Sequence, residues 1–457
     1  MLEKKNIDNL LFLFLLFHLI VWTLAPTFSN LNLPLDTIEH LAWASNLDWG
    51  YNKHPPLVAF VLSIFFEIFG NQDWAYYFLS QTFVILSFFI VYKFAEDFFN
   101  SKKLALLSIL LLEGIIFYNF TSPEFNVNVC QLPFWAMSIY FSWRCIKFDN
   151  TYDYICLGLI VGLGILSKYL FVYLVIGIKL LFLYLLKKKK KFKFLNLFIG
   201  GLLTLIVLLP HLIWLTENNY MTVSYGLQRA GGNDIFLDHF IFPSTFLLKQ
   251  FGLLIPLLIM MYFLLRKIKF SIDFKDEKLI FLIFTTVIPL LLILLTSIIM
   301  GAKIRTMWMT PFYLFFGVLF LYIFKKNIKI NNLRSFVFIF TFFLILSPVV
   351  YLGVSLSNDM KRTDYPGKEI ARLVQNKWDQ NFVNEIRVVI GSEWYAGNLS
   401  YHLNSRPKWM LNLDNDTDKI GANEGVVYTG NPKVLKEICP GVFGTIKPVG
   451  YCMIGQK

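Results

Sequence analysis

The chain has 457 residues, of which 56% are hydrophobic and 16% are charged, whereas soluble domains carry about 25% charged residues. This composition excludes an ordinary soluble protein and predicts a helical membrane protein, because the apolar runs are long and unbroken rather than short and alternating. The net charge of +12 comes from short basic loops without a recognition motif, so we expect no nucleic-acid partner.

About eleven membrane-spanning helices are expected from the lengths of the apolar runs. The first run follows a basic N-terminus and is not followed by a small-residue cleavage site, so we interpret it as a retained helix rather than a signal peptide. The expected spans are residues 10–26, 74–94, 104–120, 126–143, two spans within 152–186 divided near Lys168, 194–215, 246–265, 279–300, 307–324 and 336–355.

Basic segments fall on one side of this layout, and the positive-inside rule makes that side the cytoplasm. The N-terminus is then cytoplasmic, while the loop 27–73 and the C-terminal part of the chain are external. The basic segments are the N-terminus and residues 100–103, 144–147, 187–194, 266–278 and 325–334.

The C-terminal part of the chain has the mixed composition of a small soluble α/β domain. Residues 367–380 have helical spacing and residues 386–391 read as a buried strand, so we expect a membrane domain at 1–356 and an external domain at 357–457. Cys439 and Cys452 lie in this external domain, where disulfides persist, and are candidates for a disulfide bond.

Carboxylates interrupt the apolar sequence at three external positions. Asp36 and Glu39 are three residues apart, so a helix would place both on one face; a capped helix lying on the membrane explains the same pair. Glu124 is expected at the outer end between two spans, where ionisable side chains usually face a wet cavity. Glu113 lies within a predicted span and is open to a purely structural role.

Cationic residues occur at outer helix ends, against the usual orientation bias. Lys168, Lys303 and Arg305 must pair, reach lipid headgroups or hold an anion, and a cluster of such cations suits a phosphate group. Three further residues flank the other large external loop: His211, Arg229 and Lys249.

Several segments together resemble the large-bundle membrane glycosyltransferases, a group that includes protein O-mannosyltransferases and bacterial transferases acting on lipid A. "DTIE" at 36–39 and "WGYNKHPPL" at 49–57 resemble the first external loop of this group, and "TSPEF" with "FWA" resembles its junction between the third and fourth helices. "KIRTMWMTPFYLFFGVLF" is similar to its late basic segment, and "SEWYAGNLSYHLNSRPKW" to its exported C-terminal domain. The similarity covers most of the chain and is closest to the bacterial branch.

The resemblance implies a large helical bundle of the GT-C type in the bacterial inner membrane, with its active site facing the periplasm. Such enzymes take one sugar from a polyprenyl-phosphate carrier, here undecaprenyl phosphate, and place it on an acceptor with inversion at the anomeric carbon. We expect lipid A or lipopolysaccharide as the acceptor, with a protein acceptor as the alternative.

The resemblance also implies roles for individual residues. The leaving phosphate would be held by cations, namely Lys53 or His54 together with Lys168, Lys303 and Arg305. Asp36 would act as the base toward a hydroxyl acceptor, while Glu39 or Glu124 would orient donor or acceptor; a phosphate acceptor would need no strong base.

This chain departs from the family pattern at two positions. Many relatives have a lysine directly before the two prolines, where this chain has His54 preceded by Lys53, and Glu124 stands where Asp is more usual. The prolines would stiffen the turn toward the membrane, and Tyr51 suits the membrane interface. The open question is which of the two neighbours meets the phosphate.

Two other functions remain as alternatives. A lipid flippase would require two related halves, and no internal repeat is seen. A lipid-linked polysaccharide polymerase would use arginines in a late external loop, where Arg229 lies. No certain cofactor is expected: metal-ligand spacing is absent, and a divalent ion held by Asp36, Glu39 and Glu124 is compatible with the sequence but not indicated by it.

Overall fold

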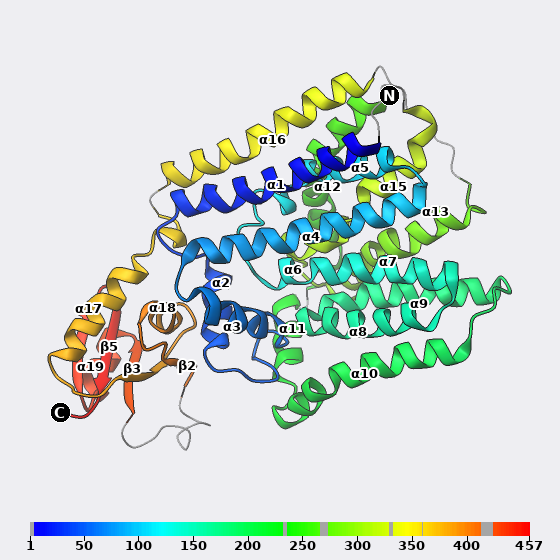
Figure 1. Ribbon diagram of the computed structural model, residues 1–457. Helices are drawn as coiled ribbons and strands as arrows, with labels where there is room; N and C mark the ends of the chain where they lie inside the picture. The colour runs from blue at the N-terminus through cyan, green and yellow to red at the C-terminus, as the bar shows by residue number, and fades with distance from the viewer. Residues whose placement is uncertain (1–3, 232–234, 266–272, 329–331, 359, 413–423) are drawn as a thin grey trace. The chain divides into compact units, whose positions relative to one another are not determined.

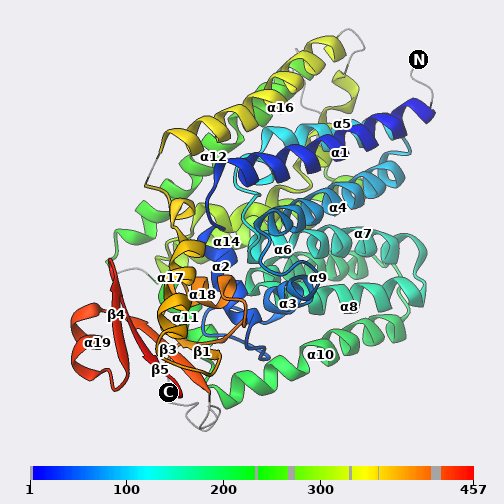
Figure 2. The same ribbon diagram turned by 60° about the vertical axis from the view of Figure 1, so that its left-hand side comes forward.

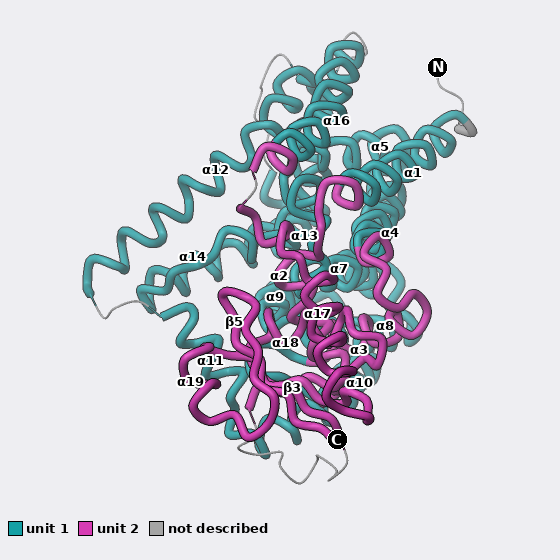
Figure 3. Tube along the Cα trace, turned by 90° about the vertical axis from the view of Figure 1, so that its left-hand side faces the viewer, with its two compact units in different colours: residues 1–25, 49–55, 77–353 teal, residues 26–48, 56–76, 354–457 magenta. Residues whose placement is uncertain are grey.

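The computed structural model describes residues 4–231, 235–265, 273–328, 332–358, 360–412 and 424–457. The chain forms two compact units, one made of residues 1–25, 49–55 and 77–353, and the other of residues 26–48, 56–76 and 354–457 (Figure 3). The second unit thus draws on most of residues 27–73, which the sequence predicts to be external, as well as on the C-terminal part of the chain. The domain boundary expected near residue 356 stays a prediction.

The first unit consists of long helices, several of which run side by side, such as α1 and α16 (Figures 1 and 2). Its helices, some of which continue into the second unit, are α1 (Lys4–Ser29), α4 (Asp73–Phe99), α5 (Lys102–Leu110), α6 (Val127–Cys130), α7 (Leu132–Phe148), α8 (Thr151–Ser167), α9 (Val172–Lys187), α10 (Phe194–Glu217), α11 (Met221–Ala230), α12 (Asp238–Leu265), α13 (Glu277–Leu282), α14 (Ile288–Met300), α15 (Phe316–Phe324) and α16 (Asn332–Ser357).

Seven helices in the described part of the chain are long and apolar enough to cross a membrane, and an eighth span results if Thr306–Tyr313 and Phe316–Asn327, bent by 54°, are taken together. Leu57–Phe69 and Thr151–Ser167 are shorter apolar helices. The number of eleven spans and their orientation therefore stay predictions. Parts of the basic segments that set the orientation, residues 1–3, 266–272 and 329–331, lie outside the described residues.

The third expected span, 104–120, is not one continuous helix. α5 ends at Leu110, and two short 3-10 turns follow, η1 (Leu111–Gly114) and η2 (Ile116–Tyr118). The chain packs closely on α12 at this point, because a Cβ added at Gly114 would lie 2.7 Å from the backbone of Leu257. Only glycine allows the two backbones to approach this closely.

A close helix crossing sets the position of α10. A Cβ at Gly158 in α8 would lie 2.3 Å from the carbonyl oxygen of Gly200 in α10, and the hydroxyl of Thr204 donates to the Gly158 carbonyl over 2.9 Å. Small residues permit such contacts between apolar helices, where few other forces hold helices together in a bilayer. This crossing anchors the helix that carries His211.

The second unit contains a five-stranded sheet of order β2-β1-β3-β5-β4, in which β1 pairs in parallel with β2 and β3, and β5 is antiparallel to both β3 and β4. The α/β composition predicted for this region is confirmed. The elements of this unit are α2 (Leu35–Ala44), α3 (Leu57–Phe69), α17 (Gly367–Asp379), β1 (Ile386–Ile390), α18 (Tyr395–His402), β2 (Lys408–Met410), β3 (Gly425–Gly430), α19 (Pro432–Ile438), β4 (Val442–Ile446) and β5 (Val449–Ile454).

Covalent and polar contacts tie this second unit together. Cys439, just after α19, forms a disulfide with Cys452 in β5, the pair that the sequence suggests. Arg406 joins α2 to α18, because its guanidinium donates to the Leu41 carbonyl over 2.6 Å and to the Ser400 hydroxyl over 3.0 Å. The same guanidinium lies 4.1 Å from the centre of the Phe66 ring in α3, so one side chain links α2 and α3 to the C-terminal segment.

Candidate active site

A cavity of about 440 Å³ in the first unit gathers four basic side chains. Most of its wall is apolar and comes from α9, α11 and α14. The basic residues along it are Lys53, His54, Lys168 and Arg229, which come from three separate parts of the chain. A pocket that combines an apolar wall with a few polar groups is typical of a ligand site.

The loop that carries Lys53 and His54 is held at three successive residues. His211 Nδ1 lies 2.6 Å from the Trp49 carbonyl oxygen, and the hydroxyl of Thr222 donates to the Tyr51 carbonyl over 2.5 Å. Between them, Gly50 lies against the Trp214 ring, where an added Cβ would come within 2.3 Å of a ring carbon.

A turn then brings the two basic residues to the cavity. The Tyr51 amide donates to the His54 carbonyl over 3.1 Å, which closes a turn around Lys53. Pro55 and Pro56 follow, and α3 begins at Leu57. The backbone of Trp49, Gly50 and Tyr51 is therefore clamped by α10 and α11, and Lys53 and His54, which follow directly, line the cavity.

Lys168 enters the cavity wall because helix α8 ends beside it. The chain turns extended at Lys168, whose φ is −165°, before a 3-10 turn leads into α9. The ammonium of Lys168 donates to the side-chain oxygen of Asn128 over 2.5 Å and lies 5.3 Å from the centre of the Trp308 ring. Asn126 in turn caps α6 by accepting from the amides of Asn128 and Val129, which fixes the chain carrying the Asn128 side chain.

Sequence reasoning did not select Asn128, Tyr169, Thr222 or Trp308, although the last three also line the cavity. The spacing of these residues in the chain carries no signal that they meet. Their proximity to Lys168 or to the clamped loop is a property of the packing. Tyr169 directly follows the predicted site residue Lys168, and this adjacency is the one sequence feature that could have indicated Tyr169.

Lys303 and Arg305, expected to bind the same phosphate, are not among the residues that line this cavity. The neighbouring residues Ala302 and Ile304 do line it. Lys303 and Arg305 lie exposed, whereas the two apolar residues face the cavity. Lys303 instead lies 5.8 Å from the centre of the Phe242 ring. A phosphate-binding role for this basic pair stays a prediction.

The candidate carboxylates divide between the two units. Asp36 and Glu39 lie on α2 of the second unit, where Pro34 precedes the helix and Asp36 occupies its first turn. The helical spacing expected for this pair is thus present. Glu124 belongs to the first unit, in the segment between η2 and α6, and does not line the cavity. That these carboxylates join the cations in one active site remains a prediction.

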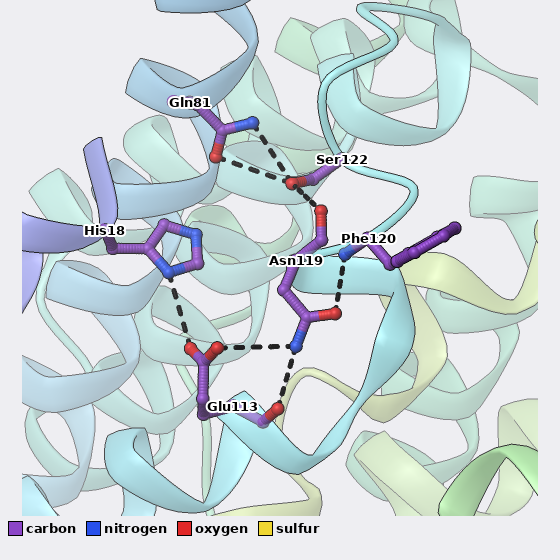
Figure 4. Close-up of polar contacts among 6 residues, drawn as sticks. All are labelled: His18, Gln81, Glu113, Asn119, Phe120 and Ser122. Atoms are coloured by element: carbon purple, nitrogen blue, oxygen red, sulfur yellow. Dashed lines mark hydrogen bonds and ion pairs between the residues drawn. The ribbon is translucent and has the colours of Figure 1, made fainter. Parts of the chain in front are cut away.

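Glu113 forms part of a separate buried polar cluster (Figure 4). One of its carboxylate oxygens lies 3.4 Å from Nδ1 of His18 in α1, and both side chains are fully buried. Asn119 donates to the Glu113 carbonyl over 2.8 Å, and Gln81 in α4 donates to the Ser122 hydroxyl over 3.1 Å. Because the Ser122 hydroxyl itself donates to the Asn119 carbonyl over 2.8 Å, the cluster holds the chain just before Glu124 between α1 and α4. This arrangement favours the structural role for Glu113.

No group of three or more His, Cys, Asp or Glu residues within the described ranges is arranged to hold a metal ion.

Residues 53–214 match the family model described as dolichyl-phosphate-mannose-protein mannosyltransferase. The chain is also 24% identical over 319 residues to the lipid A galacturonosyltransferase RgtD of Rhizobium johnstonii. That alignment covers 66% of this chain and 65% of the relative, so it spans slightly less than two thirds of the relative's length.

Two crystal structures of ArnT from Cupriavidus metallidurans share the fold. The structure bound to undecaprenyl phosphate has a TM-score of 0.65 at 12% identity and covers 99% of this chain and 98% of that one. The apo structure has a TM-score of 0.66 at 11% identity and covers 98% of both chains. The resemblance to membrane glycosyltransferases is confirmed by these matches, as is the expectation of a helical bundle with a small C-terminal sheet.

Proposed function

We propose that this chain, which has the fold of the GT-C membrane glycosyltransferases, transfers a single sugar from a polyprenyl-phosphate carrier to a lipid A or lipopolysaccharide acceptor. The reaction would take place at the periplasmic face of the bacterial inner membrane. Residues 357–457 would form a domain on that same side. The observation that carries this proposal is the cavity in which Lys53, His54, Lys168 and Arg229 meet an apolar wall.

A lipid phosphate matches both parts of this cavity. Ammonium and guanidinium groups form charge-assisted hydrogen bonds to phosphate oxygens, and the apolar wall suits the first isoprenoid units of the carrier. The carrier phosphate is also the leaving group of the transfer, and cations already placed around it stabilise the charge that it gains. Protonation of the leaving group by a general acid is then unnecessary.

The carboxylates complete the proposed reaction. Asp36 would remove the proton from an acceptor hydroxyl while that oxygen attacks the anomeric carbon, which inverts the configuration as the sugar–phosphate bond breaks. Glu39 and Glu124 would orient donor and acceptor. With a phosphate acceptor, which is already nucleophilic, all three carboxylates would have a positioning role.

The named relatives support the choice of donor and acceptor. One relative is a lipid A galacturonosyltransferase, and one structural neighbour was crystallised with undecaprenyl phosphate. A protein acceptor is the second candidate, because the matched family model is described as a protein mannosyltransferase. Both candidates use the same cavity for the carrier and differ only in the acceptor.

Binding of undecaprenyl phosphate to the purified chain tests the donor site. We expect the lipid to raise the unfolding temperature of the wild type, and Lys168→Met to weaken binding at least tenfold. Lys179→Met is the matched control, because Lys179 lies on α9 but lines a different groove. Equal binding by the wild type and Lys168→Met would contradict the cavity assignment.

Mass spectrometry of lipid A from cells with and without the chain tests the acceptor. The proposal expects a mass difference of one sugar in lipid A that requires the intact gene and is lost with Asp36→Asn. Glycosylated protein in place of modified lipid A would establish the second candidate. Normal sugar transfer by an Asp36→Asn variant at wild-type expression would contradict Asp36 as the base.

A further inference from the structure

A hydrogen-bonded chain of three residues joins the cavity wall to the loop that carries Lys53 and His54. The Tyr169 hydroxyl lies 2.6 Å from Nε2 of His211, and Nδ1 of His211 lies 2.6 Å from the Trp49 carbonyl oxygen. Tyr169 lines the cavity, whereas His211 is only 1% exposed. His211 does not itself line the cavity, and it connects Tyr169 of the cavity wall to Trp49 of the loop.

The backbone carbonyl fixes the direction of this chain of bonds. A carbonyl oxygen can only accept, so Nδ1 of neutral His211 carries the proton and donates to Trp49. Nε2 is then the acceptor and takes the hydrogen of the Tyr169 hydroxyl. Neutral histidine, which donates on one edge and accepts on the other, satisfies both contacts.

The ring of His211 is held in place by a second contact. It stacks on the Trp214 ring, with 6.0 Å between centroids and 14° between planes. Trp214 is the residue that packs against Gly50. Two successive loop residues, Trp49 and Gly50, therefore rest on two residues of one face of α10.

We propose that His211 is a positioning residue of the donor site, which holds the loop of Lys53 and His54 in register with the wall of Tyr169 and Lys168. This inference rests on the proposed function, because it assumes that those cations bind the carrier phosphate. His211 itself would touch neither donor nor acceptor. Its loss should weaken binding of the carrier phosphate by displacing two cations together, without removing any charge from the cavity.

Two substitutions separate the two bonds of His211. Asn places an amide N–H near the position of Nδ1, so His211→Asn keeps a donor for the Trp49 carbonyl. Gln places its amide group near the position of Nε2, so His211→Gln keeps a partner for Tyr169 and loses the bond to the loop. If the loop bond positions the cations, His211→Gln should be the more damaging of the two.

The experiment measures binding of undecaprenyl phosphate and steady-state sugar transfer by the full-length protein in detergent. We expect His211→Gln to raise the Kd for the lipid and the KM for the donor about tenfold with kcat within twofold of the wild type, and His211→Asn to stay within threefold in Kd. His239→Gln is the matched control, because His239 also bonds a backbone carbonyl, that of Ile298 at 2.7 Å, and does not line the cavity.

The outcomes distinguish this inference from the proposed function. If the wild type binds the lipid and His211→Gln binds it equally well, the positioning role is overturned while the donor site stands. If His211→Gln and His211→Asn lose binding equally, the loop bond is not what matters, and the inference is overturned as well. If the wild type does not bind undecaprenyl phosphate at all, the proposed function itself fails and this inference fails with it.

Discussion

Lys53 and His54 are adjacent in the chain, and both line the same cavity. The turn closed by the Tyr51 amide and the His54 carbonyl brings them there together, and the clamp on Trp49 and Tyr51 sets its position. Both side chains therefore line the cavity in which we propose that the carrier phosphate binds.

Single substitutions decide which neighbour meets the phosphate. A lost charge-assisted hydrogen bond costs about 1.5–3 kcal/mol, which is roughly a 10- to 150-fold loss of affinity. We expect Lys53→Met to show such a loss in undecaprenyl phosphate binding and His54→Gln to lose less, because the ammonium is charged at every physiological pH. The reverse order would assign the phosphate to His54.

Arg229→Gln, measured in parallel, tests whether the fourth basic residue of the cavity also contributes to binding of undecaprenyl phosphate.

His402 in the second unit illustrates how burial controls charge. Its Nε2 lies 3.1 Å from the side-chain oxygen of Asn32, whose amide donates to Asn398 over 2.7 Å. Burial lowers the pKa of His402 to about 4, with a smaller contribution from the charge of Lys368. The imidazole is therefore neutral at pH 7 and donates to Asn32.

A pH dependence of stability follows from that shift. The unfolded chain takes up a proton as the pH falls through about 6.5, whereas folded His402 takes it up only near 4. The contribution of His402 to the free energy of unfolding is therefore fully present above about pH 6.5, and it is lost as the pH falls toward 4. We expect His402→Gln, which keeps a donor for Asn32, to show a smaller drop in unfolding temperature between pH 7 and pH 5 than the wild type. An unchanged drop would contradict this account.

At the scale of elements, the residues that follow the end of α5 at Leu110 are packed and hydrogen-bonded rather than frayed. Gly114 allows α12 to approach, and Glu113 beside it turns toward His18 of α1. The segment that leads to Glu124 thus leaves the helix at a defined point and is bonded on both sides (Figure 4). Buried polar groups inside an apolar bundle specify such an arrangement because leaving one unpaired is costly.

A double-mutant cycle on His18 and Glu113 tests whether they stabilise the bundle as a pair. We expect each of His18→Leu and Glu113→Leu to lower the free energy of unfolding by about 2–4 kcal/mol, because each leaves a buried polar partner unsatisfied. The double variant should lose less than the sum, since it removes both partners. Thermal unfolding in one detergent measures all four proteins. Additive losses would show that the two side chains act independently.

At the scale of the whole molecule, membrane orientation decides which substrates can reach the cavity. The basic segments predict a cytoplasmic N-terminus and an external C-terminal domain. The disulfide between Cys439 and Cys452 is compatible with an oxidising compartment. Polyprenyl-phosphate sugars presented on the external side would then be the available donors.

Labelling of introduced cysteines in intact spheroplasts tests this orientation. We expect a membrane-impermeant maleimide to label a Glu437→Cys variant and not a Lys188→Cys variant, each in a chain whose Cys130, Cys145 and Cys156 are replaced by serine. Both introduced sites are exposed, so permeabilised cells should label both. Labelling of Lys188→Cys in intact spheroplasts would contradict the predicted orientation and, with it, the proposal of a periplasmic active site.

The sequence by itself determined the class of protein and much of its secondary structure. Apolar run length predicts helices wherever a bilayer must be crossed, and most expected spans overlap a long helix, because backbone groups in lipid have few other ways to satisfy their hydrogen bonds. The loop motif at 36–57 also indicates Lys53 and His54 as candidate phosphate ligands. These are local properties, set by residues close together in the chain.

The tertiary structure alone decided which residues share a cavity. Lys168 and Arg229 join Lys53 and His54 there, while Lys303 and Arg305 do not line it although their charge is the same. The bonds of His211 to Tyr169 and Trp49 span 42 and 162 residues of sequence. No local pattern encodes such pairings, because they depend on how α8, α10 and the loop pack, and the close approach of Gly158 to Gly200 sets that packing for the two helices.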